Sequence, residues 1–106
     1  MQEATFLILT ALASSSQHGY GIIADVSRIS EGRVQLRAGT LYAALDRLRI
    51  DGWITIDREE IVESRLRRYY RLTPYGKSQL AIEAARIQSN AAVAVARLDV
   101  TRARTE

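Results

Sequence analysis

Residues 38–54, AGTLYAALDRLRIDGWI, read as an amphipathic helix that runs into a strand. The buried face is predicted by four apolar residues at helical spacing, which are Leu41, Ala44, Leu45 and Leu48. Asp51 and Gly52 mark the helix end, because glycine fits a helix C-terminus. The outward face combines a tyrosine and an arginine with small residues, and its members are Thr40, Tyr42, Ala43, Asp46, Arg47 and Ile50. A surface that only meets solvent does not need this set, so we expect the face to bind something.

Two helices are predicted before this segment and a pair of strands after it. Residues 3–13 are apolar on more than one side of a helix, with Phe6, Leu9 and Ala13 away from the main apolar face. A second helix follows HGYG at 18–21, and the alternation VQLR at 34–37 predicts a brief strand. The stretches 53–58 and 65–72 alternate with period two and predict an antiparallel pair with a flexible tip at 59–64. One of Tyr69 and Tyr70 is expected in the core and the other in cross-strand packing near Trp53.

A long helix is predicted at the end of the chain. Thr73 suits the capping position and Pro74 the first position of this helix. Apolar residues then follow at heptad spacing and form a seam made of Leu80, Ala84, Ile87, Ala91, Ala94 and Leu98. A helix over residues 74–98 would be roughly 36 Å long, more than its own domain needs. We therefore expect it to pair with a second copy, and we expect residues 99–106 to form a loose tail.

This order of elements predicts a winged helix-turn-helix, a mainly α fold with a small β-hairpin wing (α+β). Residues 1–73 would form the DNA-binding domain and residues 74–98 a dimerisation helix, with residues 1–13 contributing to the dimer. In such folds the third helix enters the major groove of double-stranded DNA, and a two-fold dimer reads two related half-sites.

Composition and charge agree with a single intracellular domain. The chain has 106 residues, no cysteine and no long unbroken apolar run, so we expect a cytoplasmic protein without disulfides or a membrane span. Net charge is −2 over residues 1–32, +3 over 33–73 and +2 over 74–106, which sums to +3. A basic middle is a hint of nucleic acid.

Several short motifs resemble the PadR-type transcriptional regulators. They are HGYGI at 18–22, GTLYAALDRL at 39–48, GWI at 52–54 and RRYYRLT at 67–73, with Gly76 and Leu80 after them. Their order and spacing are those of the family, and the resemblance covers about residues 5–80. It implies a homodimeric DNA-binding repressor, and release by small ligands in some members. Some members stack ligands on a tryptophan in the last helix, whereas here Trp53 is the only tryptophan and lies at the root of the wing.

The candidate DNA-binding residues are Arg37, Thr40, Tyr42, Ala43, Asp46, Arg47, Arg65, Arg67 and Arg68. For Tyr42, contact with DNA competes with packing on the second helix. Thr40 suits the N-cap of the third helix as well as a phosphate contact. Arg47 has the reach and fork to read guanine, or else pairs with Asp46 or Asp51. In the wing, the arginines face DNA unless Glu59, Glu60 and Glu63 neutralise them.

The sequence leaves the control of the protein and two alternative functions open. An apolar effector would bind between subunits, against Phe6, Leu9 and Ala13 with the seam residues. No cofactor is required. A metal-responsive repressor using His18, the only histidine, is a weaker alternative, since transition-metal sites need more imidazole or thiolate than this chain has. A protein–protein adaptor built on the same fold is the other alternative. No catalytic set is evident, so we expect no enzyme activity.

Overall fold

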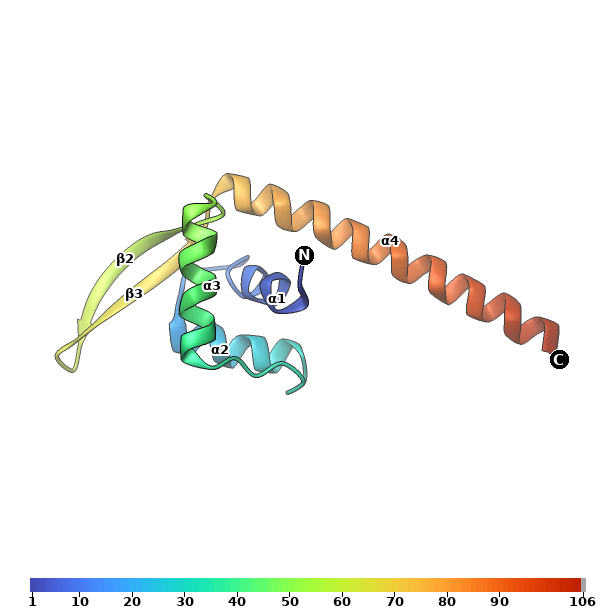
Figure 1. Ribbon diagram of the computed structural model, residues 1–106, viewed down its shortest axis with the longest axis horizontal. Coiled ribbons are helices and arrows are strands. Elements are labelled where there is room, and N and C mark those ends of the chain that lie inside the picture. The colour runs from blue at the N-terminus through green and yellow to red at the C-terminus, as the bar shows by residue number, and fades with distance from the viewer. Residues whose placement is uncertain (106) are drawn as a thin grey trace.

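The computed structural model describes the backbone of residues 1–105 and the side chains of residues 1–99. Its elements are α1 (Glu3–Ala11), β1 (Gln17–His18), α2 (Gly19–Ile29), α3 (Ala38–Ile50), β2 (Ile54–Val62), β3 (Arg65–Leu72) and α4 (Pro74–Thr105). Helices α1, α2 and α3 form a small globular head, β2 and β3 project from it as a wing, and α4 runs away from it on the other side (Figure 1). The mainly α winged helix-turn-helix with a long last helix is therefore confirmed.

The head is held together by the apolar faces predicted from the sequence. Leu41 and Leu45 of α3 are fully buried and Leu48 is almost so, against Ile22 and Val26 of α2. Burying one such side chain contributes about 1.5–3 kcal/mol. The opposite side of α3 is left exposed, as expected. Leu9 is an exception to the predicted pattern: it is 0% exposed and belongs to this core, so it does not form a free second face of α1.

The wing is a tight hairpin within a sheet of order β1-β3-β2. Glu63 and Ser64 have φ values of 50° and 64°, the left-handed conformation that a two-residue hairpin turn requires. The pairing runs from Ile54↔Leu72 to Val62↔Arg65, so β2 includes most of the stretch expected to be a flexible tip. Tyr70 is the buried tyrosine. Tyr69 does not pack near Trp53; its ring lies 5.4 Å from that of His18, while Trp53 lies against Tyr75.

The third strand is not where the alternation at 34–37 predicted it. Residues 34–37 form no strand, whereas Gln17 and His18 pair with Tyr70 and Tyr69 of β3. Val34 and Leu36 alternate because they pack against the core from a loop. That loop is fixed by Ser30, whose buried hydroxyl accepts the N–H of Val34 at 3.0 Å.

The ends of the helices are also partly different from expectation. Thr40 does not cap α3: the N-cap residue is Arg37, no side chain caps the helix, and Thr40 lies within its first turn. Gly52 ends α3 with φ +80°, as predicted. Thr73 caps α4 as predicted, since its hydroxyl accepts the N–H of Gly76 at 3.0 Å. Helix α4 continues past Leu98 to Thr105, where a loose tail was expected.

Among the residues that the structure describes, no helix combines the length and the apolar character needed to cross a membrane.

Candidate nucleic-acid interface

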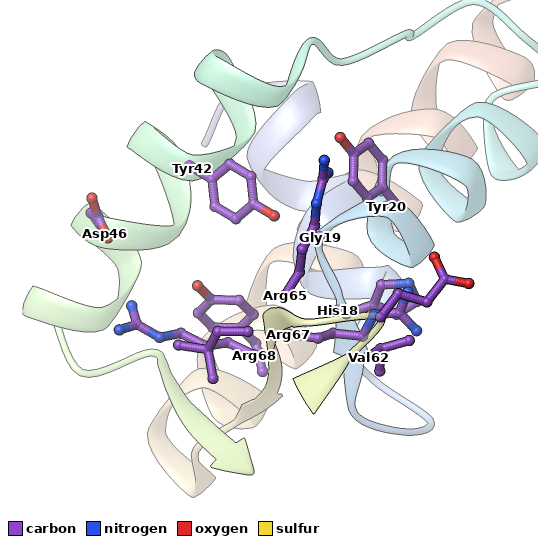
Figure 2. A pocket seen from close by; sticks show the side chains of 12 residues that line it. His18, Gly19, Tyr20, Tyr42, Asp46, Val62, Arg65, Arg67 and Arg68 are labelled. Carbon is purple, nitrogen blue, oxygen red and sulfur yellow. The ribbon is translucent and has the colours of Figure 1, made fainter. Parts of the chain in front are cut away.

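A hollow of about 850 Å³ separates the wing from the outer side of α3 and the start of α2. Five predicted site residues surround it, namely Tyr42, Asp46, Arg65, Arg67 and Arg68. It is completed by residues that the sequence did not single out as binding residues, namely Gly19, Tyr20, Val62, Glu63, Leu66 and Tyr70, and by His18, considered there only as a metal ligand. We call this cavity the wing hollow. Figure 2 shows the rings of Tyr42 and Tyr20 on either side of the Arg65 side chain, as seen from that direction.

Tyr42 reaches the wing hollow across the first residue of α2. A Cβ atom placed on Gly19 would lie 2.3 Å from the hydroxyl oxygen of Tyr42, so the tyrosine rests directly on this glycine. The side chain is nevertheless 42% exposed. The packing on α2 foreseen for Tyr42 is therefore present, while its contact with DNA stays a prediction.

The arginines of the wing and α3 fall into two groups. The paired group consists of Arg58 with Glu60 at 3.0 Å, Arg68 with Glu59 at 3.4 Å, Arg71 with Asp57 at 3.4 Å and Arg49 with Asp46 at 3.9 Å. Four others have no hydrogen bond or ion pair from their side chains within the described part of the chain, and these are Arg37, Arg47, Arg65 and Arg67. These four cations are therefore the ones that an anionic partner meets without first breaking an ion pair.

Arg47 lies on the other flank of α3, away from the wing. It borders two hollows of about 450 and 440 Å³, both of which include Gln2 and Thr5 near the start of α1. Thr40 and Ala43 border the second of them. No ion pair joins Arg47 to Asp46 or Asp51 in the structure, since Asp46 pairs with Arg49 instead. The predicted set thus spans both flanks of α3, while Arg37 stands exposed at the start of the helix.

His18 is the histidine that borders the wing hollow. Burial lowers its pKa from the ordinary value of 6.5, the positive charge of Arg67 lowers it further, and Glu60 acts in the opposite direction. Among the described side chains there is no group of three histidine, cysteine or acidic residues placed to hold a metal ion. Asp25, an acidic residue near His18 in the sequence, is engaged by Gln17 at 3.0 Å and by Arg28.

The residues missed from the sequence carry two kinds of signal. Tyr20 is an exposed aromatic side chain beside a glycine at a helix start, within the HGYG motif, and this combination could have been recognised. Leu66 and Val62 are ordinary strand residues, and only the hairpin register brings them to the hollow.

The fold and this surface define a winged helix-turn-helix protein with a partly basic surface formed by α3 and the wing. The sequence model of the Transcriptional regulator PadR-like family matches residues 8–82, and the chain belongs to this family. The resemblance drawn from the motifs is thereby confirmed.

Individual relatives are similar over most of the chain. A protein named as a transcriptional regulator in Mycobacterium tuberculosis is 36% identical over 73 residues, which are 69% of this chain and 64%, less than two thirds, of that protein. A PadR family transcription regulator from Clostridium difficile has a TM-score of 0.75 at 27% identity, over 92% of this chain and 99% of that one. Bacillus subtilis PadR, solved in complex with operator DNA, shares the fold with a TM-score of 0.70 at 24% identity, over 78% of this chain and 48% of that one.

Proposed function

We propose that this chain is a sequence-specific DNA-binding repressor that acts as a homodimer and is released by a small effector. The observation that carries the proposal is the surface around α3. It combines an exposed outer side of the helix, the hydroxyl group of Tyr42, and arginines without ion pairs on both flanks. The fold of the Bacillus subtilis PadR bound to operator DNA supports the same use of this architecture.

Phosphate contact and base reading fall to different residues. Arg65 and Arg67 border the wing hollow and have no ion pair, so they are suited to the DNA backbone. Arg68 has to exchange Glu59 for a phosphate and gains less. Arg47, on the outer part of α3, has the fork geometry that reads the O6 and N7 atoms of guanine.

The salt dependence of binding tests this division. The probe is a duplex selected by the protein from a randomised pool, titrated at several salt concentrations. Arg65→Ala and Arg67→Ala should each weaken binding to all sequences and reduce the salt slope by about 1, and Arg68→Ala should do so less. Arg47→Ala should cost about 1–3 kcal/mol and relax the preference at one position per half-site.

Two outcomes of this titration contradict the proposal. If the protein shows no salt-dependent duplex binding even at low salt, the adaptor alternative replaces the regulator. If Arg47→Ala leaves the specificity ratio unchanged, Arg47 is not the reading residue.

Dimerisation is supported by the far part of the seam. Leu80 packs against the core of its own chain, but Ala91, Ala94 and Leu98 are exposed on the part of α4 that extends beyond the head (Figure 1). A second α4 would remove this stripe from water, and the alanines permit close approach of two helices.

Effector binding is supported by a hollow of about 490 Å³ between α1, the end of α2 and α4. It contains Phe6 and Ile87 from the predicted pocket, together with Ile29, and it adds two cations, Arg33 and Arg86. Arg86 is held by Glu83, and Arg33 by Glu3 at 2.9 Å. An effector with an apolar body and a polar group therefore fits this hollow better than a wholly apolar one.

A thermal-shift screen of such compounds and of divalent metals, followed by duplex titration with each hit, tests the proposal. A hit that stabilises the protein without weakening duplex binding would count against release.

A further inference from the structure

The tip of the wing carries two large apolar side chains that are mostly exposed. Ile61 and Leu66 are direct cross-strand partners, one pair before the turn, and they are 79% and 57% exposed. We call them the tip pair. A tip that only approached phosphates would gain nothing from such residues, since apolar side chains stabilise a complex by leaving water.

The tip pair lies on the side of the wing that faces α3. Side chains alternate along β3, so Leu66 shares a face with Arg68, Tyr70 and Leu72. Tyr70 and Leu72 are buried against the head, and Leu66 borders the wing hollow. The tip pair therefore lies on the same face of the sheet as its core-facing residues, but beyond the head. It points toward the space that DNA bound by α3 would occupy.

Charge around the tip favours a nucleic acid as the occupant. Arg65 and Arg67, which flank Leu66 in β3, have no hydrogen bond or ion pair from their side chains among the described residues. Glu63 in the turn opposes them, and Glu60, the cross-strand partner of Arg67, adds a second negative charge that is shared with Arg58. The tip thus carries charges of both signs beside two apolar side chains. Attraction to phosphate alone does not explain why the apolar side chains are there.

We propose that the tip pair enters the minor groove next to the major groove read by α3, where Ile61 and Leu66 contact deoxyribose and the floor of the groove. Minor-groove proteins bring isoleucine and leucine into this groove as apolar wedges, and arginines are attracted to narrow A·T-rich grooves. The N2 amino group of guanine projects from the floor and blocks close approach. The wing then selects A·T over G·C at its position in the site. This inference rests on the proposed function.

Base analogues that differ only in the minor groove provide the test. The probe is the duplex selected from a randomised pool, and hydroxyl-radical protection locates the minor-groove segment covered by the tip. Diaminopurine in place of adenine adds the amino group there, and inosine in place of guanine removes it; both leave the major-groove edge unchanged. For the wild type, diaminopurine within the segment should weaken binding about tenfold, the size of a typical single-position effect.

Variants of the tip separate it from the rest of the protein. The double variant Ile61→Thr, Leu66→Thr keeps strand-forming residues and all the arginines. Diaminopurine should change its affinity for the duplex by less than twofold. Ile82→Gln alters another exposed apolar residue, on α4, and should retain the wild-type preference. Thermal unfolding of each variant checks that the fold is kept.

Each other outcome overturns the inference in an identifiable way. If the wild type is indifferent to the amino group, or if the double variant is as sensitive as the wild type, the tip pair does not read the minor groove, while specific binding through α3 stands. If no duplex binding occurs, both this inference and the proposed function fail. A double variant that binds DNA normally but loses a protein contact would assign the tip pair to a protein partner instead.

Discussion

At the scale of single residues, the contact between Gly19 and Tyr42 joins the first residue of α2 to the outer side of α3. The glycine leaves room for the phenol ring, and any side chain there would push the ring away from the wing hollow. The displaced atoms belong to the far end of a flexible side chain, so the fold can adjust while the hydroxyl moves.

Gly19→Ala should therefore leave the protein folded but weaken duplex binding about as much as Tyr42→Phe does. The physical reason is that the new Cβ atom would lie 2.3 Å from the Tyr42 hydroxyl. In a Tyr42→Ala background the same change should have little further effect, because nothing remains to displace. Duplex titrations of the wild type and these four variants measure this, and additive losses would show that Gly19 acts independently of Tyr42.

His18 should make stability depend on pH. Its pKa is lowered by burial and by Arg67, so the folded state binds its proton less readily than the unfolded chain. The stabilising contribution of the neutral ring is present above the ordinary pKa and is lost as pH falls through it toward the folded value. Acidification from about pH 7.5 to about pH 5.5 should thus reduce the free energy of unfolding more in the wild type than in His18→Gln. Equal losses in urea unfolding at the two pH values would contradict this.

At the scale of elements, the junction of α3, the wing and α4 is fixed by one threonine. The Thr73 hydroxyl donates to the carbonyl of Gly52 at 2.6 Å and accepts the N–H of Gly76 at 3.0 Å. A Cβ atom on Gly76 would lie 2.0 Å from the carbonyl oxygen of Trp53, so only glycine permits this approach. The root of α4 is therefore joined both to the end of α3 and to the base of the wing.

Thr73→Val should destabilise the protein by about 1–2 kcal/mol, because the substitution removes the cap of α4 while keeping the shape of the side chain. Ser78→Ala, at an exposed position of the same helix, is the matched control and should change stability by less than about 0.5 kcal/mol. Urea unfolding measures both. A Thr73→Val protein as stable as the control would mean that the cap contributes nothing.

The elements that sequence reasoning predicts well are those with a repeating pattern. The apolar spacing of Leu41, Leu45 and Leu48 predicts α3, and Thr73 with Pro74 predicts the start of α4. Strand β1 has two residues and thus no period to detect, and the loop at 34–37 imitates a strand because its apolar residues pack on the core. The wing hollow depends on contacts between distant segments, so the sequence indicated its arginines but not the part played by Gly19 or Leu66.

At the scale of the whole molecule, α4 is too long for the head that it leaves. The molecule extends 65 Å in its longest direction and only 28 and 21 Å in the others, and most of that length is α4 (Figure 1). In the proposed dimer, a second copy would offer the same stripe to the exposed part of the seam.

Ile87→Glu and Leu98→Glu should convert a dimer into monomers, since each places a charge in the seam. Val93→Glu is the matched control: Val93 is 48% exposed, close to the 45% of Ile87, but lies off the seam. Sedimentation at micromolar concentration distinguishes these states. A monomeric wild type, or an equal effect of Val93→Glu, would remove the seam as the dimer contact.

The firm attachment of α4 at Thr73 gives the helix the properties of a lever. Its 32 residues span about 48 Å at 1.5 Å per residue, so a tilt of about 10° at the root moves the far end by about 8 Å. Conversely, a large displacement of the far end of α4 corresponds to only a small rotation of the head. A molecule wedged beside Phe6 and Ile87, about 20 Å along the helix from Pro74, would instead turn the head through a larger angle for each ångström of displacement than one that acts at the far end.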